Sequence, residues 1–145
     1  MRTLAVLLLA LAAAPAAAIA PPPAEEAQAD QDRVTGEGLV RQGRFELSIP
    51  SLIEATKRDP MVADLHVYLA FALRNVGRRE EAAAHYRFAL RLDPDNRWAL
   101  AYYGVMLLED GRRAEAEEKR AALARICPAG CAEREELDRA FAARS

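Results

Sequence analysis

The chain has 145 residues, of which 52% are apolar, and a formal net charge of −2 at pH 7. This length suffices for one small domain with a core and is too short for two sizeable ones. The mildly acidic balance argues against a general nucleic-acid binder, because such a protein needs a basic surface that displaces counterions from phosphates. The apolar residues are unevenly distributed, however, and their first block differs from the rest.

The first eighteen residues have the pattern of a secretory signal peptide. Arg2 gives a positive start, residues 4–14 are uninterruptedly apolar, and Pro15 precedes three small residues. This is the order of n-region, h-region and A-x-A cleavage site. We expect cleavage after Ala18, with cleavage after Ala20 as the alternative. The apolar stretch is too short for a membrane anchor, so a mature protein without a membrane span, periplasmic or secreted, is expected.

Residues 19–29 are expected to form a proline-rich, disordered tether. Three consecutive prolines occupy residues 21–23, and Glu25 and Glu26 follow them. Consecutive prolines favour an extended polyproline conformation, and the segment lacks the apolar periodicity that packing requires. We interpret it as a spacer and not as a motif for a proline-binding domain.

The remainder of the chain repeats itself every 34 residues. Five sets of equivalent residues keep this interval: Gly36, Ala70 and Gly104; Leu39, Leu73 and Leu107; Gly43, Gly77 and Gly111; Ser48, Ala82 and Ala116; Pro60, Pro94 and Pro128. Such a period is typical of repeat proteins whose units stack on one another.

Each unit is predicted to contain two helices. Apolar residues at spacings of three and four predict helices over residues 30–42, 45–58, 65–76, 79–92, 97–110 and 113–126. A glycine ends the first helix of each unit, and the proline ends the second. A seventh helix over residues 132–143, with Leu137, Ala140 and Phe141 on one face, is expected to cover the apolar back of the last unit.

This pattern resembles the tetratricopeptide repeat family. The match is fullest in the second unit, at Ala70, Leu73, Ala82, Tyr86, Ala89 and Pro94. The third unit departs from it with Arg120 at the aromatic position, and the first has Pro50 inside its second helix. The resemblance implies an all-α solenoid of three helix-turn-helix units (29–62, 63–96 and 97–130, together 29–130) and a capping helix within 131–145. Abundant alanine, with 18 arginines against 2 lysines, is typical of a GC-rich bacterial genome, so a small exported bacterial member is expected.

The resemblance also implies a concave groove, lined by the first helix of each unit, that holds an extended peptide or a partner helix. Transferring the groove positions of the family to this sequence selects Arg33, Glu37, Arg41, Val67, Phe71, Arg74, Asn75, Trp98, Val105 and Leu108. We therefore expect a ligand with apolar anchors for the aromatic residues and acidic groups for the arginines. The alternative is that Phe71 and Trp98 only pack between adjacent units. The carboxylate clamp of the family is not expected, because Arg33 and Glu37 stand where it needs lysine and asparagine.

Two cysteines and two histidines are the candidates for chemistry. Cys127 and Cys131 flank Pro-Ala-Gly, and in an exported protein they are expected to form a structural disulfide that holds the capping helix. A thiol-disulfide function of this pair is a weaker alternative, since redox pairs usually have C-x-x-C spacing. His66 and His85 have no pattern of neighbouring metal ligands and are interpreted as polar residues at helix surfaces or joints.

The sequence therefore predicts a non-enzymatic interaction module without metal or cofactor. Its expected role is that of a periplasmic adaptor or assembly factor whose partner is another protein or a peptide, and not nucleic acid. A structural or self-associating envelope protein, with a homo-oligomeric state, is the alternative.

Overall fold

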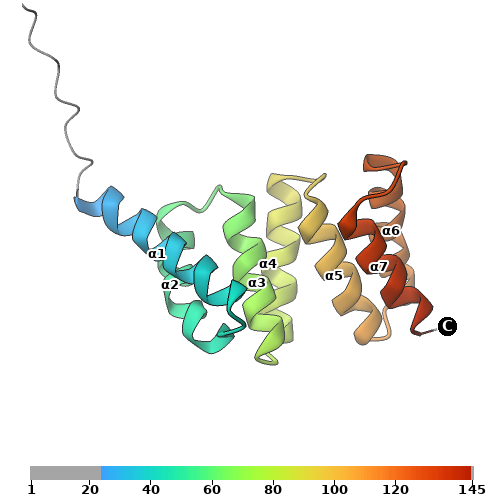
Figure 1. The fold of residues 1–145 in the computed structure, drawn as a ribbon, viewed down its shortest axis with the longest axis horizontal. Coiled ribbons are helices and arrows are strands. Elements are labelled where there is room, and N and C mark those ends of the chain that lie inside the picture. The colour runs from blue at the N-terminus through green and yellow to red at the C-terminus, as the bar shows by residue number, and fades with distance from the viewer. Residues whose placement is uncertain (1–23, 145) are drawn as a thin grey trace, which may run out of the picture.

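The computed structural model describes residues 24–144, which form seven α-helices and no strand. The helices follow one another along the long axis of the molecule (Figure 1). They are α1 (Ala24–Arg41), α2 (Phe45–Arg58), α3 (Ala63–Asn75), α4 (Arg79–Leu92), α5 (Arg97–Glu109), α6 (Arg113–Ile126) and α7 (Ala132–Ala142). None of them is long and apolar enough to cross a membrane.

The main difference from the predicted elements lies at the start of α1. The helix begins at Ala24, so the tether predicted for residues 19–29 is wrong over residues 24–29. That segment consists of alanine, glutamate and glutamine, whose high helix propensity lets the helix extend toward the prolines without any apolar periodicity. The predicted signal peptide, both cleavage positions and residues 19–23 lie outside the described residues.

The repeated glycines close the turn inside each unit. Gly43, Gly77 and Gly111 have φ angles of 71°, 83° and 73°, in the left-handed region that glycine adopts without steric penalty. This conformation turns the next backbone N–H toward the repeated leucine: the amides of Arg44, Arg78 and Arg112 donate to the carbonyls of Leu39, Leu73 and Leu107 at 2.8–2.9 Å. The glycine and leucine sets therefore keep the same interval because the leucine carbonyl accepts the hydrogen bond of the turn that the glycine makes possible.

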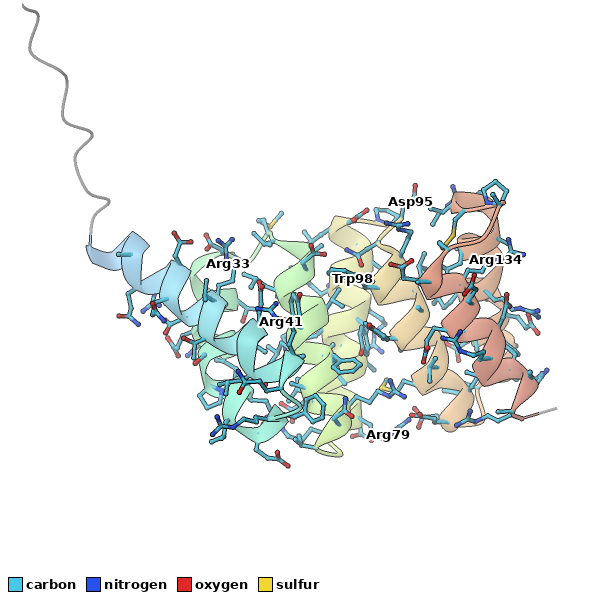
Figure 2. The ribbon with its side chains drawn as sticks, viewed as in Figure 1. Arg33, Arg41, Arg79, Asp95, Trp98 and Arg134 are labelled. Atoms are coloured by element: carbon cyan, nitrogen blue, oxygen red, sulfur yellow. A yellow bond between two sulfur atoms is a disulfide. The ribbon has the colours of Figure 1, made fainter. Side chains whose placement is uncertain are left out.

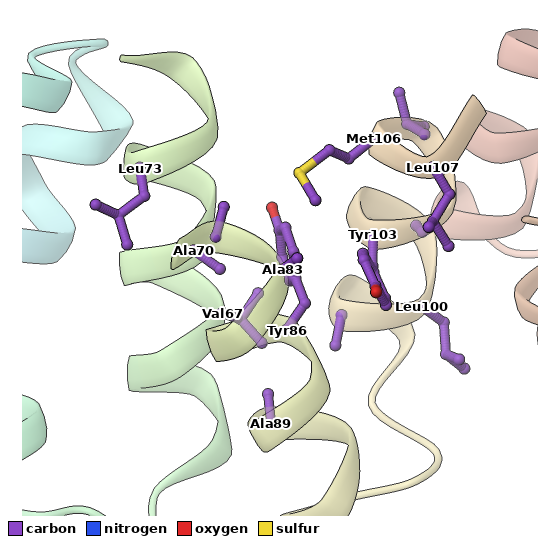
Figure 3. Close-up of a cluster of buried hydrophobic side chains, with 14 of the residues drawn as sticks. Val67, Ala70, Leu73, Ala83, Tyr86, Ala89, Leu100, Tyr103, Met106 and Leu107 are labelled. Carbon is purple, nitrogen blue, oxygen red and sulfur yellow. The ribbon is translucent and has the colours of Figure 1, made fainter. Parts of the chain in front are cut away.

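The core is a row of small interfaces between neighbouring helices. In the middle unit Tyr86 of α4 is fully buried between α3 and α5, and its ring stacks on Tyr103 with centroids 5.6 Å apart (Figure 3). Ala70, Ala82 and Ala89 are also fully buried, and their small side chains allow the helices to approach. Burial is thus distributed along the array, as expected for stacked repeats.

Helix α7 covers the end of the array, as predicted. It packs on α5 and α6, with Leu137 and Phe141 buried. A Cβ atom at Gly104 would lie only 2.8 Å from a methyl carbon of Leu137, so α7 approaches α5 where a side chain is missing. Arg120, the departure from the family pattern, pairs with Asp138 of α7 at 2.6 Å, and its guanidinium lies 4.9 Å from the ring centre of Phe141. The arginine at the aromatic position therefore serves the attachment of α7.

Candidate functional site

Three adjoining hollows lie along the first helices of the units and share Trp98. The apolar hollow, of about 250 Å³, is lined by Val40, Arg41, Val67, Tyr68, Phe71, Trp98 and Tyr102. The mixed hollow, of about 540 Å³, is lined by Phe71, Arg74, Asn75, Trp98, Tyr102, Val105, Ala132, Glu133, Glu136 and Arg139. The acidic hollow, of about 270 Å³, is lined by Asp64, Asp93, Asp95, Asn96, Arg97, Trp98 and Glu133. We call the three together the groove; Trp98 lies midway along the array in Figure 2.

Aromatic rings of the second and third units form the floor of the groove, and a ring of the first unit contacts one of them. Phe71 contacts Phe45 of the first unit and Tyr102 of the third, with ring centroids 5.7 Å and 4.7 Å apart. Tyr68 meets Trp98 edge-on at 6.2 Å, yet Trp98 stays 41% exposed. Phe71 thus packs between units and also lines the groove, whereas Trp98 leaves much of its ring open. Rings held in this way offer apolar contact area at low entropic cost.

The three predicted aliphatic groove residues have different positions. Val67 lines the apolar hollow and Val105 the mixed hollow, both at least nine-tenths buried. Leu108 is 6% exposed and belongs to the core of the array, so its assignment to the groove is corrected. The reason is that α5 contacts α3, α4, α6 and α7, so its apolar residues are buried around most of its circumference.

The arginines predicted to hold acidic ligand groups already have carboxylate partners within the protein. Arg33 pairs with Asp30 at 3.1 Å, and Arg41 pairs with Glu37 at 3.6 Å. The residues Arg33 and Glu37 do not line any of the three hollows. Arg41 reaches the apolar hollow from α1, but its charge is offset by the adjacent glutamate.

Arg74 is the most firmly held of these arginines. Its guanidinium donates two hydrogen bonds to the carboxylate of Glu109, one of them at 3.1 Å, and Arg79 binds both Glu109 and Asp110. Burial opposes the ionisation of Glu109, but the hydrogen bonds from the two arginines outweigh it and lower the pKa of this carboxyl group. Burial raises the pKa of the neighbouring Tyr86 phenol, and the Arg74 cation opposes that rise. Arg74 therefore links α3 to α5 and is not free to hold a ligand carboxylate.

Several groove residues escaped the sequence prediction. Tyr68 and Tyr102 are 34 residues apart, and this interval was a signal that could have identified them. Glu133, Glu136 and Arg139 come from α7, which extends the row of first helices beyond the three units. Tyr102, Glu133 and Glu136 line the same mixed hollow, and burial together with the two carboxylates raises the pKa of Tyr102. Asn75, one of the residues assigned to the groove from the sequence, lines the mixed hollow, and its amide donates to the Phe71 carbonyl at 2.8 Å.

The two histidines lie together at the joint between α3 and α4, outside the groove. Their Nδ1 atoms are 3.0 Å apart, and the Nε2 of His66 lies 2.9 Å from the Pro60 carbonyl. Since a carbonyl only accepts, Nε2 of His66 donates, and a neutral His66 then accepts at Nδ1 from His85. Burial and the neighbouring His66 lower the pKa of His85. Among the described residues, no group of three His, Cys, Asp or Glu side chains is placed to hold a metal ion.

The disulfide between Cys127 and Cys131 joins α6 to α7. Cys127 is the C-cap of α6 and Cys131 the N-cap of α7, with Cα atoms 6.0 Å apart. Arg134 donates from one guanidinium nitrogen to the carbonyls of Cys127 and Pro128, both at 3.2 Å. The covalent bond and these hydrogen bonds hold the capping helix beside the groove, as the sequence predicts.

These features define a helical-repeat solenoid with an open groove along one row of helices. Family models described as "Tetratricopeptide repeat" match residues 34–75 and 63–106. The chain belongs to the tetratricopeptide repeat family, and its fold is that of a protein-interaction module.

Solved structures show the same fold. The TPR2B domain of yeast Sti1, in complex with pHsp70, has a TM-score of 0.71 at 21% identity, over 80% of this chain and 94% of that one. The second TPR domain of human RPAP3, bound to the HSP70 peptide SGPTIEEVD, has a TM-score of 0.70 at 23% identity, over 81% and 98%. PilF of Pseudomonas aeruginosa has a TM-score of 0.67 at 27% identity, over 79% of this chain and 51% of that one. No curated protein matches the chain.

Proposed function

We propose that this protein is an adaptor or assembly factor that binds a peptide or a partner helix in the groove and carries out no chemistry of its own. The observation that carries the proposal is Trp98, which is 41% exposed at the point where all three hollows meet. An exposed aromatic ring beside preformed hollows is the usual composition of a binding hot spot. The structurally similar domains of Sti1 and RPAP3, which are in complex with pHsp70 and with an HSP70 peptide, support a role in binding another protein or a peptide.

Site-specific photocrosslinking tests this proposal. A photoreactive amino acid replaces Tyr102 in the groove or, as the control, Ala121 on the exposed side of α6. Adducts with a partner protein are expected from position 102 and not from position 121, and Trp98→Ala should remove them while the helical circular dichroism is retained. Equal adducts from both positions, or adducts that survive Trp98→Ala, would contradict binding in the groove.

Export to the periplasm or beyond the cell is a further part of the proposal. It is supported by the pattern of residues 1–18 and by the disulfide between Cys127 and Cys131, a bond that persists in oxidising compartments. Mass spectrometry of the protein from its own envelope fraction should find an N-terminus at Ile19 or, for the alternative cleavage, at Pro21. Accumulation of the uncleaved chain in the cytoplasm would overturn it.

Self-association is the second candidate, and a different observation favours it. In the part of the chain that the structure describes, α7 covers the C-terminal end of the array, whereas four large apolar side chains are exposed near its N-terminal end: Val34, Leu47, Met61 and Val62. Exposed apolar groups gathered at one end of a molecule can mark an interface. Sedimentation at low and high concentration, with Leu47→Lys as the comparison, distinguishes the candidates: a monomer at all concentrations contradicts self-association.

A further inference from the structure

The arginines assigned to the groove from the sequence suggest that it offers positive charge to a ligand. In the structure the charge that it offers is negative. Arg41 and Arg74, the arginines that reach it from α1 and α3, are paired with glutamates inside the protein. Arg139 in the mixed hollow is paired with Glu136 at 2.6 Å. The positive charges in the apolar and mixed hollows are therefore neutralised by glutamates of the protein before any ligand binds.

The acidic hollow, by contrast, has carboxylates in excess. Its lining has four carboxylate side chains and one cation, Arg97. Asp95 pairs with Arg125 at 2.7 Å, but Asp64 only accepts a hydrogen bond from the Asn96 amide at 2.8 Å. Within residues 24–144, neither Asp64 nor Asp93 has an ion-pair partner. This end of the groove therefore has a net negative charge.

Glu133 extends this negative charge from the acidic hollow into the mixed hollow. It lines both the acidic and the mixed hollow, and its side chain is only 14% exposed. One of its oxygens, Oε2, is buried without a hydrogen bond, and the nearest cation, Arg97, lies 3.9 Å away. A carboxylate held with so little compensation adds to the negative charge of the hollow and favours a cationic ligand group beside it.

Trp98 connects this acceptor to the apolar hollow. Trp98 lines the acidic hollow and also, with Tyr68 and Phe71, the apolar hollow. An indole face attracts an ammonium or guanidinium group, and its edges accept apolar neighbours. A cationic group and an apolar group of one ligand would thus bind little more than one aromatic ring apart.

On the basis of the proposed function, the geometry points to a ligand segment that has a basic side chain next to an apolar one. The apolar side chain enters the hollow formed by Tyr68, Phe71 and Tyr102, and the arginine or lysine passes Trp98 toward Glu133 and Asp64. An extended chain advances about 3.3–3.6 Å per residue, so the two ligand residues lie within about three positions of each other. This chemistry is opposite to that of the peptide SGPTIEEVD, which the RPAP3 domain binds through the same fold.

Matched synthetic peptides test the inference. Nonapeptides with a central phenylalanine in a glycine-serine background receive one arginine, one glutamine or one glutamate at each other position in turn. Because Trp98 is the only tryptophan of the chain, its fluorescence reports occupancy of the groove directly. The best arginine peptide is expected to bind at least about tenfold more tightly than its glutamine counterpart, with an advantage that shrinks as salt increases.

Two substitutions locate the effect. Glu133→Gln and Asp64→Asn should each reduce the ratio of arginine-peptide affinity to glutamine-peptide affinity about three- to tenfold. Asparagine at position 64 can still accept from Asn96, so folding is retained. Glu118→Gln removes an exposed carboxylate on α6 and is the control, with no expected change.

The outcomes separate this inference from the proposed function. A preference for glutamate peptides, or an arginine preference that survives Glu133→Gln together with Asp64→Asn, overturns the inference and leaves binding in the groove intact. If no peptide of any charge changes the Trp98 signal, both the inference and the proposed groove are refuted. A preference for arginine that depends on Glu133 supports both.

Discussion

Replacing Gly104 with alanine is expected to weaken the attachment of α7, and a second substitution is expected to repair it. The added Cβ would lie 2.8 Å and 2.9 Å from the two methyl carbons of Leu137 and 3.4 Å from the Lys119 Cβ. The first two distances are shorter than any normal carbon contact, so Leu137 has to move. Because it is fully buried, it cannot move without disturbing the packing between α5 and α7.

The expected changes in the free energy of unfolding combine a steric cost with a gain in helix propensity. Crowding of this kind costs about 1–3 kcal/mol, and alanine recovers about 0.5–1 kcal/mol in helix propensity. Leu137→Ala alone should cost about 2–5 kcal/mol, since it leaves a cavity against Gly104. When both are changed, the new methyl group enters space that the leucine has left. The double variant should therefore be more stable than the sum of the single effects by about 1 kcal/mol or more.

Urea unfolding followed by circular dichroism measures the four members of this cycle, and hydrogen exchange of α7 reports the local effect. Gly38→Ala is the control, because a Cβ at Gly38 meets nothing within 4 Å and should bring only the gain in propensity. Strict additivity of Gly104→Ala and Leu137→Ala, or a stabilising Gly104→Ala equal to the control, would refute this account of how α7 is held.

Three further predictions concern other parts of the array. Replacing Cys127 and Cys131 with serine should lower the free energy of unfolding by about 2 kcal/mol, with faster hydrogen exchange mainly in α7; unchanged exchange there would contradict the pinning role. The pKa of His85 is lowered in the folded state by burial and His66, while Glu81 opposes this, so stability should fall as pH drops below the ordinary histidine pKa of about 6.5. His85→Gln should flatten this part of the curve of melting temperature against pH, and an unchanged slope would argue against the pair. Asn96→Ala removes the hydrogen bond to the Ala99 amide and should cost about 1–2 kcal/mol in urea unfolding, whereas a loss within error would show that the cap contributes nothing.

Much of the fold could be predicted from the sequence because it is encoded over short distances. A left-handed glycine acts together with a leucine four residues before it, and the proline after the second helix acts on the residue that precedes it; the interval of 34 repeats both signals. The start of α1 was predicted wrongly because no such local signal marks it. Residues 24–29 are helical by propensity alone and have no apolar period that could reveal it.

The groove could be predicted only in part. Phe71 and Trp98 were identified because the family pattern assigns them to the open face of the first helices, and the structure places both in the hollows. Leu108 was misplaced, since a position in one helix does not reveal how many neighbours surround that helix. The contact between His66 and His85 joins residues 19 positions apart on different helices, and no local pattern indicated it.

The sequence by itself determined the period, the helices and the turns, and it determined which small residues let the helices approach. Only the tertiary structure decided the charge of the groove. Arg74 meets Glu109 across 35 positions, and α7 brings Glu133 beside Trp98. The physical reason is that the charge available to a ligand depends on which ions are already paired. That pairing is set by how neighbouring units stack on one another, which no single segment of the chain encodes.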